Sequence, residues 1–478
     1  MKRLANRLAI RRPGGILVAA AAVALTLQGC SQTGDYQRPA SHIPEAWQTR
    51  PGTTGTSYAA AIPWRNFFRD PRLQALIGAA LAHNQDLKIA LARVAETRAQ
   101  YNIVSADRLP TASLSGSRTK TKIPGAFTGI DRPVTTERDE LSVTVVSFEL
   151  DFWGRVAQLS EAAQASFLAS ESASRALRIS LIAEVANLYY TVLELDERIA
   201  IAQGSIESRK RNRDLVKRGQ ELGAAARSDF LLAEGALHSA QGDLASLENQ
   251  RAAADHALTL LVGRAPGDLP PGHALGEQEV RQDLAPGIPS EVLYARPDVI
   301  AAENRLKEAH ANVAAARAAF LPRILLTAGL GLASPTLARL FAPGTGNWSY
   351  QPTLSMPLFD GGRTAGASDV AEARRNSAVA EYEKTIQQAF REVADLLSAR
   401  TSLAEQRQAI EATVSAYRER LIVAEARFKS GSISYLEVLD AQKELFAQQQ
   451  IAVQVRRAQL STAAQLYKAL GGGDSPDT

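Results

Sequence analysis

Two long stretches of the chain, about 155–218 and 364–428, carry apolar residues at alternating steps of three and four. Positions with this spacing in the second stretch are Val379, Tyr382, Ile386, Ala389, Val393 and Leu396. Because such positions share one helix face, the pattern predicts long α-helices that pack as coiled coils. At about 1.5 Å per residue each helix would be about 95 Å long, more than a globular core requires. A plain helical bundle would show the same periodicity.

Four shorter segments alternate apolar and polar residues, which predicts β-strands with one apolar face. They lie at 111–117, 141–145, 324–332 and 348–356, and the first is weak and rich in serine. Segments of about ten residues suit tilted strands of a membrane barrel. Soluble hairpins with one buried face would give the same pattern.

Four strands cannot close a membrane barrel, for which about eight are the practical minimum. A membrane role therefore predicts a barrel shared between copies, in which a dimer would supply eight strands and a trimer twelve. The trimer would leave room for a lumen. Loops at about 118–140 and 334–347 are polar or rich in glycine and proline, and we expect them to face outside.

The order of landmarks recurs along the chain, which indicates two tandem copies. Gly154 corresponds to Gly362, and Gly223 to Gly431, both at an offset of 208 residues. We expect Gly154 and Gly362 at strand-to-helix corners, and Gly223 and Gly431 at the turns of two helical hairpins. The predicted organisation is a signal peptide (1–29), an N-terminal anchored segment (30–69), a first repeat (70–265), a connector (266–289), a second repeat (290–473) and a C-terminal tail (474–478).

The first thirty residues have the pattern of an export signal. A basic start precedes an apolar stretch at 16–27, which is too short for a membrane-spanning helix. The sequence then reads Leu27-Gln28-Gly29-Cys30, which resembles a bacterial lipobox and predicts a lipidated Cys30 anchored in lipid. By the same resemblance, the following Ser31 favours the outer membrane. An ordinary signal peptide with an incidental cysteine is the alternative.

Composition argues against a nucleic-acid partner and against catalysis. The net charge is +4, but residues 1–29 hold five basic and no acidic residues, so the rest of the chain carries −1. The one cysteine excludes an internal disulfide framework and a cysteine-based zinc site. No Ser/His/Asp or Cys/His arrangement is apparent from spacing, and Gly329-Leu330-Gly331 lacks the third glycine of a phosphate loop. We predict no enzyme, no cofactor and no metal site.

Four passages resemble the TolC-type outer-membrane factors, particularly the NodT/OprM-like lipoproteins. They are 147–155 (SFELDFWGR), 287–303, 357–363 (PLFDGGR) and 431–473. Together they cover nearly the whole mature chain in the order of that family. The resemblance implies an α+β membrane protein, mainly α, with four β-strands and long coiled-coil helical hairpins per chain. It further implies a homotrimer in which a twelve-stranded β-barrel is continued by a periplasmic α-barrel.

The implied function is the outer-membrane channel of a tripartite efflux system in a Gram-negative bacterium. The channel would be a passive exit duct for small molecules, docked to a periplasmic adaptor protein and an inner-membrane pump, often of the RND class. The resemblance also implies an acidic ring at the periplasmic gate, at Glu437 and Asp440; solvated tip residues are the alternative. Ile433 stands where one family member has a latch arginine, and Glu437 replaces the more usual aspartate.

Two other functions are compatible with the sequence. One is an outer-membrane channel for type I protein secretion. The other is a lipid-anchored coiled-coil scaffold of the cell envelope without a pore.

Overall fold

The computed structural model describes residues 36–40, 43–44, 47, 57–58, 62–265, 267–280, 284–285 and 289–472. The predicted signal peptide, Cys30 and the C-terminal tail lie outside these residues. The described chain forms two compact units. The sheet unit contains Arg98–Ser166, Arg305–Val379 and the described residues up to Pro39, and the helical unit contains Ala40–Thr97, Phe167–Asn304 and Ala380–Thr478.

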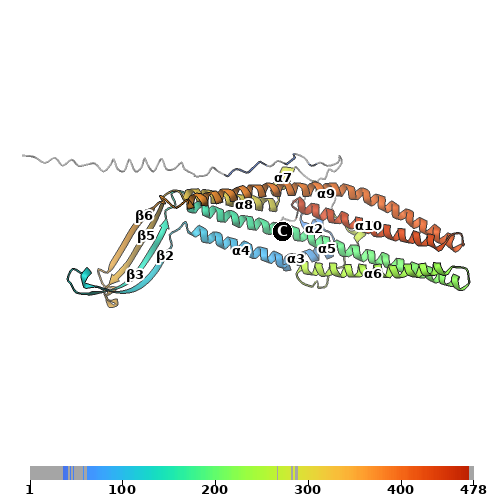
Figure 1. The fold of residues 1–478 in the computed structure, drawn as a ribbon, viewed down its shortest axis with the longest axis horizontal. Helices are drawn as coiled ribbons and strands as arrows, with labels where there is room; N and C mark the ends of the chain where they lie inside the picture. The colour runs from blue at the N-terminus through green and yellow to red at the C-terminus, as the bar shows by residue number, and fades with distance from the viewer. Residues whose placement is uncertain are drawn as a thin grey trace, which may run out of the picture. The chain divides into compact units, whose positions relative to one another are not determined.

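The sheet unit is built on one antiparallel four-stranded sheet. Its strands are β2 (Ala112–Ile123), β3 (Val134–Glu149), β5 (Arg323–Ser334) and β6 (Gly346–Ser355), in the order β2-β3-β5-β6 (Figure 1). The central contact joins β3 of the first repeat to β5 of the second. Strand alternation in the sequence therefore predicted all four strands, including the weak serine-rich one.

The predicted outer loop at 118–140 is wrong, because most of it is strand. β2 and β3 remain paired over this region, where Arg118 lies opposite Asp139 and Lys120 opposite Glu137. Lys120 and Glu137 form a salt bridge of 2.5 Å, and Arg118 contacts Asp139 at 3.4 Å. Opposite charges on facing strands stabilise a hairpin without the apolar alternation on which the prediction relied.

Helices of the first repeat are α3 (Pro71–His83), α4 (Gln85–Ala106), α5 (Arg155–Glu221) and α6 (Arg227–Val262). α3 and α4 are separate helices, because the helix is interrupted at Asn84. There the Asn84 carboxamide oxygen accepts from the Leu87 amide at 2.8 Å and caps α4.

Helices of the second repeat are α7 (Pro289–Ala295), α8 (Pro297–Ala318), α9 (Arg363–Lys429) and α10 (Tyr435–Ala469). The long helices α5 and α9 each have 67 residues, as the periodicity predicted. The remaining elements are short: β1 (Ser57–Tyr58), α2 (Trp64–Phe67), β4 (Leu284–Ala285), and the 3₁₀ turns η3 (Gly125–Phe127), η4 (Leu275–Glu277) and η5 (Leu337–Arg339).

The predicted coiled-coil positions form the core of the helical unit. Tyr382, Ile386, Ala389 and Val393 on α9 are all buried, and the series continues at Leu397 instead of Leu396. Farther along α9, most positions of the same pattern, such as Ile410 and Val414, are only half-buried. By length and apolar composition, α5 is the one described helix that could cross a membrane. Half of its most apolar 18-residue stretch is buried inside the protein.

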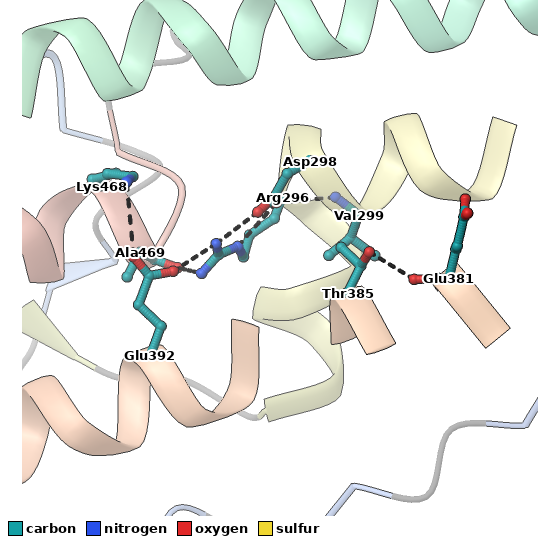
Figure 2. A network of polar contacts seen from close by, with 8 residues as sticks. All are labelled: Arg296, Asp298, Val299, Glu381, Thr385, Glu392, Lys468 and Ala469. Atoms are coloured by element: carbon teal, nitrogen blue, oxygen red, sulfur yellow. Dashed lines mark hydrogen bonds and ion pairs between the residues drawn. The ribbon is translucent and has the colours of Figure 1, made fainter. Parts of the chain in front are cut away.

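A buried arginine between α7 and α8 ties the second repeat together. The Arg296 guanidinium donates to the Ala469 carbonyl at the end of α10 at 2.9 Å, and to the carboxylates of Asp298 at 2.7 Å and Glu392 at 2.8 Å (Figure 2). Although burial alone would lower it, these carboxylates hold the pKa of Arg296 above its ordinary value. Lys468 lies 3.8 Å from Glu392 and completes the network.

Candidate functional site

One face of the sheet is apolar and exposed. Leu114, Val143, Leu330 and Trp348 are paired in one row across all four strands. Their exposed fractions are 72%, 48%, 70% and 79%, so nothing within the described chain covers this row. Large side chains in such a row are suited to contact lipid.

The opposite face is small and polar. Adjacent rows contain Ser113, Thr144, Gly329 and Ser349, and then Ser115, Ser142, Gly331 and Asn347. At Gly331 a Cβ would lie 2.6 Å from the Leu141 carbonyl oxygen, which explains the glycine. Successive rows along the strands face opposite sides, so one face of the sheet is apolar and the other is polar. Such a sheet can separate a lipid phase from water.

The corner between β3 and α5 is held by charged side chains. Glu149 binds Arg155 at 2.7 Å and also Arg323 at 2.7 Å. Asp151 accepts from the Ala157 amide at 2.7 Å, in the first turn of the helix. Gly154 has a positive φ of 74°, which a residue with a Cβ adopts with strain.

The corner between β6 and α9 repeats the design with different residues. Gly361 and Gly362 have φ values of 66° and 87°. Asp360 accepts from the Gly362 amide at 3.0 Å and from the Thr364 amide at 2.8 Å. Hydrogen bonds from the Thr364 hydroxyl and amide hold the pKa of Asp360 below its usual range.

The two hairpin turns share one backbone geometry. Gly223, between α5 and α6, has φ 74°, and Gly431, between α9 and α10, has φ 73°. In each turn the following amide donates to the carbonyl five residues back: Ala224 to Gly219 at 2.7 Å, and Ser432 to Arg427 at 2.9 Å. This pattern ends a helix with a left-handed residue, and glycine adopts that conformation without strain.

The acidic residues Glu437 and Asp440 lie in the first two turns of α10, and both are exposed. Asp440 forms a 2.5 Å ion pair with Arg420 of α9, whose guanidinium also lies 5.9 Å from the Tyr417 ring centre. Sequence reasoning missed Arg420, because it considered the acids of α10 without the facing helix. A cation therefore lies beside Asp440. Cys30 lies outside the described residues.

Residues 76–264 and 288–472 match the family described as outer membrane efflux protein. The chain is 38% identical to the toluene efflux pump outer membrane protein TtgC of Pseudomonas putida, covering 96% of this chain and 95% of the relative. It is 37% identical to the cation efflux system protein CusC of Escherichia coli, covering 94% and 98%. These relatives are named as efflux proteins, not as enzymes.

Solved structures agree with the sequence comparison. The open state of the Neisseria gonorrhoeae MtrE outer membrane channel has a TM-score of 0.84 and 34% identity, covering 93% of this chain and 98% of that structure. A CusC crystal structure has a TM-score of 0.81 and 35% identity, covering 93% and 100%. The chain therefore belongs to the outer membrane efflux protein family, and the outer membrane is its cellular location.

Proposed function

We propose that three copies of this chain form the passive outer-membrane channel of a tripartite efflux system. The main support for this proposal is the sheet. Its outer strands β2 and β6 each have one edge without a partner strand in the described chain. Unpaired backbone groups are unfavourable in lipid, so each edge requires another strand. Three sheets of four strands give twelve, enough to enclose a lumen lined by the polar rows.

The helices support the same assembly. On α9 the apolar positions Ile410, Val414 and Leu421 are half-buried, and on α6 Leu231 and Leu232 are 54% and 44% exposed. Apolar stripes of this kind gain stability when another helix covers them. Neighbouring copies would cover them in a periplasmic tube of helical hairpins.

The partners follow from this role. A periplasmic adaptor and an inner-membrane pump, of the RND class, would deliver small molecules to the tube, and the pump would supply the energy. TtgC and CusC are named for toluene and for cations, although this chain is about equally similar to both. This breadth supports a permissive duct whose cargo is selected by the pump. Lipid on Cys30 would anchor each copy to the membrane.

The periplasmic mouth would be closed by the hairpin tips. Glu437 and Asp440 from three copies would form a ring that favours cations. The ion pair between Arg420 and Asp440 neutralises part of this charge and joins α9 to α10 near the mouth. Opening would be an outward movement of the tips about the turns at Gly223 and Gly431.

Cross-linking at the mouth tests the proposal. Because Cys30 is the only native cysteine, Glu437→Cys gives each copy one additional thiol. A cleavable trifunctional maleimide, which can react with one thiol from each of three copies, is expected to join three copies and to stop efflux in cells with a matching pump, and cleavage should restore it. A monofunctional maleimide is the control. Unchanged efflux after complete cross-linking would contradict the gate, and cross-linked dimers without trimers would contradict the trimer.

A further inference from the structure

Three helices of the helical unit surround a group of buried polar atoms that have no hydrogen-bond partner among the described residues. Arg209 on α5 is 6% exposed, and Tyr435 and Gln442 on α10 are 1% and 5% exposed. Asn212, one turn after Arg209 on the same face of α5, adds a buried carboxamide nitrogen to this group. The unpartnered atoms are Arg209 Nε, Asn212 Nδ2, Tyr435 Oη and Gln442 Oε1.

Arg209 and Gln442 each contact a neighbouring helix, and Tyr435 lies near Arg209. Arg209 Nη1 donates to the Ala236 carbonyl of α6 at 2.6 Å, so the guanidinium lies between α5 and α6. Gln442 Nε2 donates to the hydroxyl of Ser208, the residue before Arg209, at 3.1 Å. Tyr435 is close enough to Arg209 for the two groups to interact electrostatically. It lies seven residues before Gln442 and on the same face of α10.

Arg209 differs from other shielded arginines of the described chain in its charge balance. Arg296, Arg155 and Arg198 each bind a carboxylate within 3.0 Å. Within the described residues Arg209 forms no salt bridge, and the carboxylate that interacts with it through space, Asp243 on α6, is exposed to solvent. A guanidinium stays charged in proteins, and an uncompensated charge is costly to bury.

We propose that Arg209, Asn212 and Tyr435 bind a small monovalent inorganic anion of the chloride type. Arg209 Nε, Asn212 Nδ2 and the Tyr435 hydroxyl supply N–H and O–H donors, and the guanidinium supplies the positive charge. Water would satisfy the donors but leave the guanidinium without a counter-charge.

The anion joins the two repeats. Arg209 belongs to the first hairpin and Tyr435 to the second, and Tyr435 is part of the apolar cluster that also contains Val216, Ala233 and Val438. A bound anion therefore stabilises the packing of α10 against α5 and α6.

The first test compares the full-length purified protein in chloride and in gluconate at equal ionic strength. We expect an unfolding midpoint higher in chloride by on the order of 2 °C, because ligand binding to the folded state stabilises it. Arg209→Gln and Tyr435→Phe should lose this difference, whereas Arg211→Gln, an exposed arginine two residues away, should retain it. Equal midpoints of the unmodified protein in both salts, or a difference retained in Arg209→Gln, would overturn the proposal.

The second test does not depend on the variants folding. Crystals of the unmodified protein grown in bromide should show an anomalous peak between Arg209 and Tyr435. Well-ordered side chains at this place without such a peak would overturn the proposal.

Discussion

The two repeats each contain a buried charged side chain that joins several elements, and the charges are opposite. In the first repeat Asp70 caps α3 and accepts from the Tyr189 hydroxyl at 2.9 Å, the His273 amide at 3.0 Å and the Gln278 carboxamide at 2.5 Å. In the second repeat Arg296 binds two carboxylates and a carbonyl. The negative charge of Asp70 is thus stabilised by neutral hydrogen-bond donors, whereas the positive charge of Arg296 is stabilised by two charged carboxylates.

The repeats also differ in how they hold their last helix. Asn84 donates to the Leu261 carbonyl of α6 at 2.8 Å, and Arg296 donates to the Ala469 carbonyl of α10 at 2.9 Å. The two carbonyls are 208 residues apart, the offset of the repeat. Equivalent carbonyls of the two last helices therefore accept from a neutral carboxamide in the first repeat and from a charged guanidinium in the second. The loss of each side chain should have a different cost.

The largest effect is expected from Arg296→Met. It leaves Asp298, Glu392 and the Ala469 carbonyl without their donor, and breaking a buried ion pair costs about 3 kcal/mol or more. We expect a corresponding fall in the free energy of unfolding per protomer in urea. Arg407→Met, which removes an exposed pair with Glu411 at 3.8 Å, is the control and should cost under about 1 kcal/mol. Equal losses in the two variants would contradict the role of Arg296.

Asp70→Asn should cost about 2 kcal/mol at neutral pH, because the carboxylate accepts several hydrogen bonds in a buried place. Although burial alone would raise it, bonds from Gln278, His273 and Tyr189 hold the pKa of Asp70 below its ordinary value of 3.8. This stabilisation is present above pH 3.8 and is lost as the pH falls through the lowered value. Unfolding measured from pH 7 to pH 2 should therefore bring the protein and the variant together at low pH. A constant gap would contradict the assignment.

Asn84→Ala is expected to have a smaller effect than Arg296→Met, of about 1 to 2 kcal/mol. It removes the cap of α4 and the bond to the Leu261 carbonyl, but leaves no unpaired charge. Asn84→Ser separates the two contacts, since its hydroxyl oxygen can still cap α4 but the shorter side chain loses the bond to the Leu261 carbonyl. Chemical unfolding of both variants should place Asn84→Ser between Asn84→Ala and the unmodified protein. If Asn84→Ala cost as much as Arg296→Met, the comparison would fail.

The smallest effect on stability is expected from Arg420→Gln, under about 1 kcal/mol, because its ion pair with Asp440 is about half exposed. Removing this cation leaves the mouth more negative, so the preference for cations should rise. Reversal potentials across a salt gradient measure that preference. Arg418→Gln, an exposed arginine on the same helix, is the control. Equal reversal potentials for both variants would argue against Arg420 lying at the mouth.

Periodic features of this chain could be predicted from the sequence, and features set by distant pairs could not. The strand rows and the 67-residue helices follow from alternation and heptad spacing. The continuation of β2 and β3 past Arg118 depends on facing charges, which a one-strand pattern does not show. At the break the Asn84 side chain bonds to the Leu261 carbonyl of α6, and Arg420 pairs with Asp440 of the facing helix, contacts that the pattern of a single helix does not show. Ser147 adopts a positive φ of 53° at a bulge in β3, where the sequence offers no glycine to mark it.

Conductance of the purified protein in a planar lipid bilayer shows whether the chain forms a pore. We expect discrete current steps, with cation preference reduced in the double variant Glu437→Ala/Asp440→Ala. A closed mouth would keep the unmodified protein silent, so Arg420→Ala/Asp440→Ala, which removes the pair between α9 and α10, is measured beside it. Silence of both proteins after confirmed insertion into the bilayer would contradict a channel.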